Sequence, residues 1–217
     1  MTDFGVARRM MVDGQVRPAD VTDLRLLAAL QDVPRETFMP AAMTGLAYLD
    51  LDVPVNESGT RRLLKPMVLA KLLQAAEIAD TDKVLDVGGG TGYSAAILSR
   101  LAGEVVALED DAALARRATE ALRGLAGVST VSGDLTAGWA AGAPYDVIVV
   151  NGAVEGAPSG LLAQLKDGGR LVCIAGSGPS GKATLYRRSG GEVGSRALFD
   201  AHAHLLAGFA KPAAFAF

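Results

Sequence analysis

The sequence predicts an α/β fold, in which a mostly parallel β-sheet is covered by helices on both faces. From Lys83 onward, short apolar runs alternate with amphipathic segments. These runs are apolar at successive positions, which is typical of strands that are buried on both faces of a parallel sheet. A glycine-rich segment, residues 88–92, stands where the first run passes into the first amphipathic segment. Both features are typical of doubly wound folds that bind a ligand at the strand ends.

The length and composition fit one globular domain. The chain has 217 residues, of which 50% are hydrophobic and 21% are charged, so it can bury a single core. We expect one domain over residues 1–217, with a helical cap in residues 1–80 and an α/β core in residues 81–217. The 26 glycines exceed the usual share of about 7%, which indicates positions where the backbone must stay free of side chains.

The charge balance excludes several classes of partner. Lys and Arg number 21 and Asp and Glu number 24, for a net charge of −3, and this balance argues against a basic face for nucleic acid or anionic lipid. No apolar stretch reaches the roughly 20 residues of a membrane span. The single cysteine, Cys173, excludes an internal disulfide and favours a reducing compartment. We therefore expect a cytoplasmic protein without nucleic-acid or membrane partners.

The two histidines, His202 and His204, form an H-x-H pair. On a strand both side chains would point to one face. Two ligands without a third nearby make a poor metal site, so we expect no bound metal.

The N-terminal part is predicted to be helical. Asp20 and Thr22 are candidate N-caps for a helix that ends before Pro34, because the residue before a proline avoids the α region. Residues 48–64 lack periodicity and predict an ordered loop, and a second helix begins near Pro66. The residues expected to be buried are Leu24, Leu27, Ala28 and Leu30 on the first helix and Met67, Leu69, Leu72 and Leu73 on the second.

The core is predicted to alternate strands and helices in chain order. The expected strands are residues 83–88, 104–109, 128–134, 145–151 and 169–175, and the expected helices are residues 94–102, 112–125 and 159–166. Gly168 and Gly169 are expected to end the last helix. The candidate terminal strands are residues 183–188, 194–206 and 213–217.

The glycine-rich segment fits one of two ligand classes better. A dinucleotide site requires G-x-G-x-x-G, but Tyr93 stands at the third glycine position. A site for S-adenosylmethionine has an acid two residues before G-x-G-x-G. Asp86 matches the acid, and Gly88, Gly90 and Gly92 match the three glycines, with Gly89 between the first two of them. A carboxylate attracts the ammonium and sulfonium of that cofactor and repels a pyrophosphate, so S-adenosylmethionine is predicted, with a purely structural turn as the alternative.

Further acids stand where this cofactor needs them. Glu109, followed by Asp110, ends the second strand and is placed to accept the ribose hydroxyls. Asp134, after Gly133, ends the third strand and is placed to accept from the adenine amino group. Leu135 would pack on the adenine ring, and Asn151 ends the fourth strand near the expected position of a transferred methyl group. Glu109 or Asp134 taken alone is better explained as a solvated residue at a helix start, whereas together with the glycine-rich segment the two acids favour the cofactor site.

The chain resembles the protein-L-isoaspartate O-methyltransferase family over nearly its whole length. The motifs that carry the resemblance are DLRLLAALQDVPRETFMP (residues 23–40), AYLDLDVPV (47–55), VLDVGGGTGYSAAIL (84–98), GDLTAGWAAGAPYDVIVVNGAVEGAP (133–158) and LLAQLKDGGRLVCIAG (161–176). The resemblance implies a Rossmann-like methyltransferase fold with seven strands, one of them antiparallel. It also implies S-adenosylmethionine as methyl donor, S-adenosyl-L-homocysteine as product, and a protein or peptide substrate whose isomerised aspartyl residues are methylated on the carboxyl group for repair.

One segment, residues 56–65, departs from the family pattern, and we refer to it as the acceptor loop. The family carries G-x-G-Q-T-I-S-x-P there, with a serine that contacts the substrate carboxylate. Leu64 stands at the serine position, and Arg61 and Arg62 stand at the glutamine and threonine positions. Leu69 replaces a family histidine.

The acceptor loop offers replacements for the missing serine. Arg61 or Arg62 can grip a carboxylate bidentately, and Ser58 or Thr60 can supply a hydroxyl group. Thr60, Arg61, Arg62 and the Leu64 position are therefore the candidate catalytic residues. Two alternatives remain open, namely a methyltransferase with another acceptor and a protein that binds the cofactor without catalysis.

Overall fold

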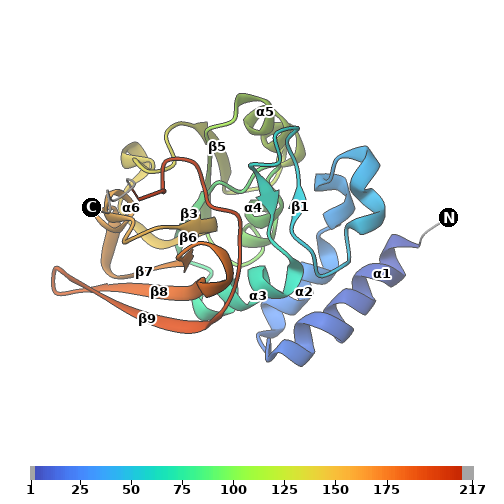
Figure 1. Cartoon of the computed structure of the whole chain (residues 1–217), viewed down its shortest axis with the longest axis horizontal. Coiled ribbons are helices and arrows are strands. Elements are labelled where there is room, and N and C mark those ends of the chain that lie inside the picture. The colour runs from blue at the N-terminus through green and yellow to red at the C-terminus, as the bar shows by residue number, and fades with distance from the viewer. Residues whose placement is uncertain (1–2, 212–217) are drawn as a thin grey trace, which may run out of the picture.

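The computed structural model describes residues 3–211, and its centre is a seven-stranded sheet (Figure 1). The strands are β3 (Lys83–Val87), β4 (Glu104–Glu109), β5 (Val128–Ser132), β6 (Tyr145–Val154), β7 (Leu165–Ala175), β8 (Lys182–Ser189) and β9 (Glu192–Asp200). Their order across the sheet is β5-β4-β3-β6-β7-β8-β9. The first five in this order are parallel, and β8 runs against both of its neighbours. The predicted mostly parallel sheet with one antiparallel strand is therefore confirmed.

Helices precede the sheet and alternate with its strands. They are α1 (Phe4–Met11), α2 (Leu24–Asp32), α3 (Pro66–Ala75), α4 (Tyr93–Leu98), α5 (Ala112–Ala121) and α6 (Ser159–Leu162). Shorter helical turns cover Val12–Val16, Arg17–Ala19, Arg35–Phe38, Ala41–Leu46, Ala140–Gly142 and Gly178–Ser180. A small separate hairpin pairs β1 (Val53–Pro54), which precedes the acceptor loop, with β2 (Arg62–Leu63) inside that loop.

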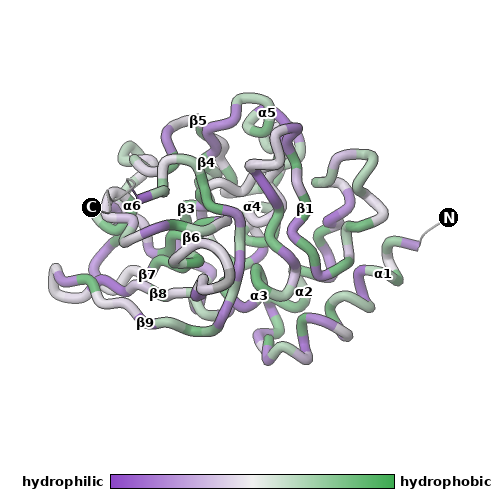
Figure 2. The backbone as a smooth tube through the Cα atoms, in the orientation of Figure 1, coloured by the Kyte–Doolittle hydropathy of each residue, from purple (hydrophilic) through white to green (hydrophobic). Residues whose placement is uncertain are grey.

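Alternate side chains of the strands point into two different hydrophobic layers. On β3, Val84 packs into a layer that includes residues of α2, α3, α4 and α5. Its neighbour Leu85 packs into the opposite layer, which is closed by α6 and by residues Leu206 and Phe209. Figure 2 shows the apolar strands at the centre of the fold and polar residues on the surrounding turns. Burial on both faces explains the continuous apolar runs in the sequence.

The N-terminal helices are attached to the core by buried apolar residues and by one arginine. Arg25 of α2 donates to the carbonyl oxygen of Ile78 at 3.2 Å and to that of Leu101. Leu26 and Leu30 are fully buried on the same helix. The predicted stop is confirmed, because α2 ends at Asp32, before Pro34.

The buried face of α2 was predicted wrongly at two positions. Leu24 is 74% exposed, and Ala28 is exposed too. The helix starts later than expected, because Asp23 is the N-cap and accepts from the backbone N–H groups of Arg25 and Leu26. Its buried residues are Leu26, Leu27, Ala29 and Leu30. On α3, Leu69, Leu72 and Leu73 are buried as predicted, whereas Met67 is only partly buried.

The segment after α6 was also predicted wrongly. The helix ends at Leu162, and Gly168 and Gly169 lie inside β7 rather than at a helix end. Leu165 already pairs with Tyr145 of β6, so the sheet takes over before the predicted helix would finish. Gly168 has φ +78 in the register shift that follows this pair.

The last predicted strands differ in outcome. Residues 183–188 lie in β8. The proposed strand at residues 194–206 ends as β9 at Asp200, and the chain then continues in an extended segment with one bridge at Leu205. The proposed strand at residues 213–217 lies outside the described residues.

Candidate functional site

The glycine loop, residues 88–92 after β3, has a backbone that requires glycine. Gly88, Gly90 and Gly92 have φ of +68, +64 and +96, a region that L-residues with side chains seldom adopt. At Gly89 a Cβ atom would lie 2.5 Å from Oδ2 of Asp86. The loop therefore brings bare backbone close to the ends of the strands, with α4 beginning at Tyr93.

Asp86 lies under this loop and is held by two side chains. It is 1% exposed, and it accepts from Ser94 Oγ and from Asn151 Nδ2, each at 2.7 Å. Asn151 also donates to the carbonyl oxygen of Val87 at 3.2 Å. β3 and β6 pair in parallel, so Asp86 on β3 and Asn151 on β6 lie close to each other near the strand ends. Burial raises the pKa of Asp86 to about 6, although both hydrogen bonds act in the opposite direction.

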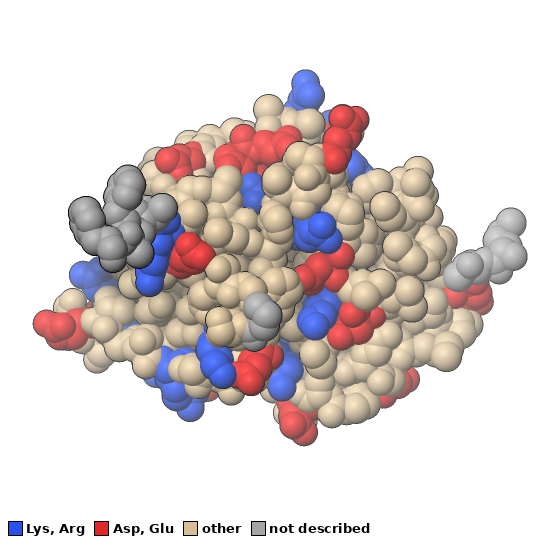
Figure 3. Space-filling view, viewed as in Figure 1, with Lys and Arg blue, Asp and Glu red and all other residues tan. Residues whose placement is uncertain are grey.

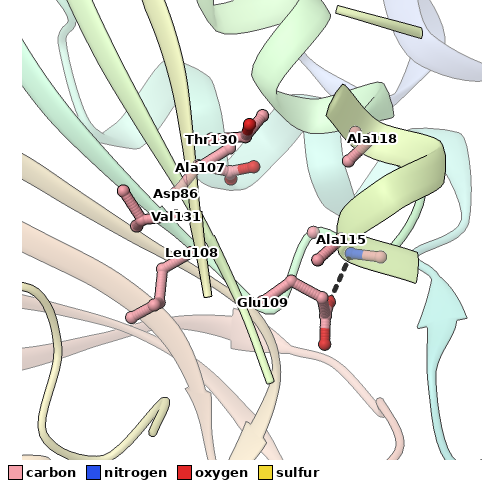
Figure 4. A pocket seen from close by; sticks show the side chains of 11 residues that line it. Asp86, Ala107, Leu108, Glu109, Ala115, Ala118, Thr130 and Val131 are labelled. Atoms are coloured by element: carbon pink, nitrogen blue, oxygen red, sulfur yellow. Dashed lines mark hydrogen bonds between the residues drawn. The ribbon is translucent and has the colours of Figure 1, made fainter. Parts of the chain in front are cut away.

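Glu109, at the end of β4, faces the same loop (Figure 4). Its Oε2 accepts from the backbone N–H of Gly90 at 2.9 Å. Its Oε1 accepts from the N–H groups of Asp110 at 3.1 Å and Asp111 at 3.2 Å. Burial raises the pKa of Glu109, and the nearby charge of Arg61 opposes that rise. Asp86 and Glu109 line a small cavity of about 10 Å³ together with alanines of α5, seen in Figure 4.

Residues 133–135, which follow β5, lie near the glycine loop. Asp134 is exposed and accepts from the backbone N–H and the hydroxyl of Thr136, each at 2.7 Å. These hydrogen bonds lower its pKa. Leu135 is buried, and its Cδ1 would lie 3.3 Å from a Cβ at Gly88. Gly133 lies beside the ring of Trp139.

The segment after β9 returns to the end of β6 and covers the same region. Ala153 donates its N–H to the carbonyl oxygen of His204 at 2.9 Å, and Leu206 donates to that of Ala153 at 3.0 Å. The side chain of Leu206 fits against Gly88 and Gly152, where added Cβ atoms would lie 3.3 and 2.6 Å away. The sequence showed no signal for this contact, because it depends on how the extended segment folds back.

The acceptor loop lies against the loop that follows β4. Asn56 accepts from the backbone N–H of Arg61 at 3.0 Å and donates to Asp111 at 3.3 Å. Ser58 and Thr60 are joined by a hydrogen bond of 2.8 Å between their hydroxyl oxygens. Both are exposed or nearly so, so Thr60 remains accessible as a hydroxyl group.

The two arginines of the acceptor loop have different environments. Arg61 is 4% exposed, and its Nε lies 3.0 Å from Glu109 Oε1, while its Nη2 contacts Asp110 Oδ1. Arg62 is partly buried and donates from Nε to the carbonyl oxygen of Gly59 at 3.2 Å. Arg62 also lines a groove of about 920 Å³ between the acceptor loop, Ala41–Leu46 and α5. Of the two, Arg62 is therefore the one that borders an open cavity.

Leu64 belongs to the hydrophobic core, with 4% exposure. Its carbonyl oxygen accepts from Nη2 of Arg35 at 2.9 Å. Arg35 is fully buried, its guanidinium lies 4.7 Å from the centre of the Tyr93 ring, and its Nε and Nη1 have no hydrogen-bond partner in the described structure. The contacts of Arg35 with Leu64 and Tyr93 were not predictable from the sequence, because Arg35 stands beside Glu36 and Thr37 in a segment of mixed polarity.

Comparison with known proteins decides the family. The family model for protein-L-isoaspartate(D-aspartate) O-methyltransferase matches residues 9–200.

The chain belongs to this family.

Curated members of the protein-L-isoaspartate O-methyltransferase family are similar along most of their length. Protein-L-isoaspartate O-methyltransferase 1 of Rhodopseudomonas palustris (strain HaA2) is 38% identical over 203 residues, which is 92% of this chain and 82% of that protein. The protein-L-isoaspartate O-methyltransferase of Koribacter versatilis is 39% identical over 92% of this chain and 90% of its own. The resemblance seen in the sequence motifs is thereby confirmed.

Solved structures agree with the fold. One named protein-L-isoaspartate O-methyltransferase superposes with a TM-score of 0.81 at 25% identity, over 93% of this chain and 66% of that chain. A homologue from Plasmodium falciparum, crystallised with S-adenosyl-L-homocysteine, superposes with a TM-score of 0.78 at 15% identity, over 92% and 97% of the two chains. The latter supports the fold alone.

The described residues contain neither a metal-binding cluster nor a helix that could span a membrane. In residues 3–211, no group of three or more His, Cys, Asp or Glu side chains is placed to hold a metal ion. His202 and His204 are exposed beyond the end of β9. No helix among the described residues is long and apolar enough to cross a membrane. On the face shown in Figure 3, basic and acidic side chains are intermixed.

Proposed function

We propose that the protein is an S-adenosylmethionine-dependent O-methyltransferase that esterifies the carboxyl group of isoaspartyl residues in proteins or peptides. The observation that carries this proposal is the convergence of Asp86, the glycine loop and Glu109 at adjacent strand ends in a member of this family. The proposed product of the donor is S-adenosyl-L-homocysteine. We also propose the cytoplasm as the compartment, without nucleic-acid or membrane partners.

The residues of the site fit the proposed cofactor. The left-handed glycines form a cradle that side chains would fill, and the acids supply acceptors for an ammonium group, a ribose and an adenine amino group. The residues that would hold the cofactor are Asp86, Gly88, Gly89, Gly90, Gly92, Glu109, Asp110, Gly133, Asp134, Leu135 and Asn151. When bound, the cofactor supplies an electrophilic methyl group on a sulfonium.

The chain's own contribution to the reaction is positioning. A carboxylate acceptor is already ionised near neutral pH, so no general base is needed, and orientation and electrostatics supply the acceleration. Residues 1–80 would form the cap and acceptor loop over the core in residues 81–217. Because Leu64 has no hydroxyl group, Thr60, Arg61 and Arg62 are the residues proposed to orient the acceptor.

A second acceptor class is favoured by one observation. The side chain at the family's serine position is an apolar core residue, Leu64, which cannot hydrogen-bond a carboxylate. A methyltransferase with a different small-molecule or protein acceptor is therefore the alternative function.

The deciding experiment compares an isoaspartyl peptide with its normal aspartyl twin as acceptors of a radioactive methyl group. We expect selective labelling of the isoaspartyl peptide and at least about tenfold slower labelling by Asp86→Asn, because the ammonium of the cofactor loses its carboxylate partner. Asp80→Asn, a change at an exposed acid away from the loop, is the matched control. Equal labelling of both peptides would favour the second acceptor class.

A further inference from the structure

Arg61 connects the acceptor loop to the acids proposed to hold the cofactor ribose. Its guanidinium contacts Glu109 and Asp110 through two different nitrogens. The side chains of Arg61 and Glu109 are each only 5% exposed. Such charge-assisted hydrogen bonds between buried partners are stronger than hydrogen bonds between neutral groups.

The position of Arg61 is fixed by contacts other than the ion pair. Its backbone N–H donates to Asn56, which in turn donates to Asp111. Its Cγ would lie 3.4 Å from a Cβ at Gly90, so the aliphatic part of the side chain rests on the glycine loop. The acceptor loop is therefore attached to the glycine loop and to the loop after β4.

Donors of the protein itself fill one oxygen of the Glu109 carboxylate. In the described structure Oε1 accepts from Arg61 and from two backbone N–H groups, whereas Oε2 accepts from Gly90 alone. Each carboxylate oxygen has about two lone-pair positions. Ribose hydroxyl groups that bind both oxygens therefore have to replace a donor on Oε1, and Arg61 is the one that a side-chain movement can remove.

Displacement of Arg61 has a consequence for the acceptor. A guanidinium removed from two carboxylates and kept out of water is costly unless another anion pairs with it. The acceptor loop is the segment in which the family binds the substrate carboxylate, and its serine position is filled here by Leu64. The acceptor's own carboxylate is a suitable new partner for Arg61.

We propose that Arg61 exchanges partners during the reaction cycle: it releases Glu109 when that carboxylate binds the cofactor ribose, and its guanidinium then binds the acceptor carboxylate. This inference rests on the proposed function. It makes Arg61 a residue that lowers cofactor affinity and raises acceptor affinity, and it requires the cofactor to bind before the acceptor.

The test titrates S-adenosyl-L-homocysteine into the wild type and Arg61→Gln, with Trp139 fluorescence as the signal. Trp139 is the chain's single tryptophan and lies beside Gly133. We expect about tenfold tighter binding by Arg61→Gln, because the ribose no longer competes with the guanidinium for Glu109. Arg116→Gln, which removes an exposed charge from α5, is the control and should bind like the wild type.

The acceptor arm of the test uses initial rates. Arg61→Gln is expected to raise KM for the isoaspartyl peptide about tenfold, with Arg116→Gln unchanged. Hydrogen exchange supplies an independent readout: the ligand should accelerate exchange in residues 56–61 of the wild type and leave the already rapid exchange of Arg61→Gln unaltered.

The outcomes separate this inference from the proposed function. Wild-type binding together with equal or weaker binding by Arg61→Gln overturns the exchange, as does an unchanged KM in Arg61→Gln. Absence of ligand binding in both the wild type and Arg61→Gln overturns the proposed function and the exchange together. Binding by Arg61→Gln but not by the wild type supports the exchange.

Discussion

In the described structure, the buried carboxylate of Asp86 accepts hydrogen bonds from two neutral side chains, Ser94 and Asn151, and forms no ion pair. Its burial raises the pKa from 3.8 to about 6, so the folded protein binds a proton at this position more tightly than the unfolded chain does. By linkage, the charged form at neutral pH lowers the free energy of unfolding.

Asp86→Asn is expected to stabilise the ligand-free protein near neutral pH. The penalty from Asp86 is absent below the unfolded pKa of 3.8, grows as the pH rises, and is complete above about 6. Removing this penalty raises the free energy of unfolding by on the order of 2–3 kcal/mol at high pH. Urea unfolding at several pH values between about 4 and 8 measures the gain. Asp80→Asn should show no such trend, and a gain for Asp86→Asn that is independent of pH contradicts the explanation.

Arg35 shows what residue-level sequence analysis missed. The motif that contains it was used only to indicate the family, whereas the structure buries Arg35 between Leu64 and Tyr93. By contrast, Asp86, Glu109 and the glycines were predictable, because the ends of neighbouring parallel strands must meet at one edge of the sheet. The ion pair of Arg61 was not, since a side chain's partner depends on how a loop without periodicity folds.

Replacing Arg35 by Met is expected to cost less stability than replacing it by Ala. Two of its guanidinium nitrogens have no hydrogen-bond partner in the described structure, so removing the buried charge relieves a desolvation cost. Met keeps most of the volume, whereas Ala leaves a cavity that costs about 2 kcal/mol more. Denaturant unfolding of the two variants decides this, and equal losses would mean that packing around Arg35 is unimportant.

At the scale of elements, the types of the core helices and strands were predicted better than their ends. The strand at β7 begins earlier than predicted, because Leu165 pairs with Tyr145 and sheet pairing prevails over a local helical pattern. The N-cap of α2 is Asp23, whose side chain accepts from two N–H groups of the helix. Gln74 of α3 accepts from the backbone N–H groups of Thr22 and Asp23, and the choice between nearby candidate caps depends on such tertiary contacts, which a single sequence does not contain.

The turn that leads into β5 contains two glycines with positive φ and different surroundings. Gly124 has φ +86 with open space around a built Cβ, and Gly127 has φ +74 with Gly103 O at 2.6 Å. Gly124→Ala is expected to cost about 1 kcal/mol from backbone strain alone. Gly127→Ala should cost at least about 2 kcal/mol more, since it pushes against the backbone that pairs β4 with β5. Urea unfolding of both variants checks this, and equal costs would contradict the steric account.

At the scale of the whole molecule, the fold class followed from the sequence because it depends on average properties. Apolar runs separated by amphipathic segments specify a sheet that is covered on both faces, whichever residues supply the contacts. The way in which the segment after Asp200 folds back over β6 did not follow, because its short alternating pattern fits several positions.

A ligand that binds only the folded chain should raise its melting temperature. At about 100 times its Kd, S-adenosyl-L-homocysteine is expected to raise the free energy of unfolding by about 2.7 kcal/mol. This gain corresponds to a rise in melting temperature of roughly 5–10 °C for a protein of this size. Nicotinamide adenine dinucleotide at the same concentration should have no effect, because Asp86 repels its pyrophosphate. Differential scanning calorimetry measures both, and a larger shift with the dinucleotide would reverse the choice of cofactor.

The order of the strands also implies an order of assembly during folding. β8 and β9 are joined by a tight turn between Ser189 and Glu192, and such hairpins form within microseconds. The central pair of β3 with β6 joins Val84 to Val147, so it must close a loop of roughly 60 residues first. Asp86 and Asn151 thus meet late in folding. A partly folded chain therefore lacks the proposed cofactor site, and an excess of ligand should slow unfolding without accelerating refolding.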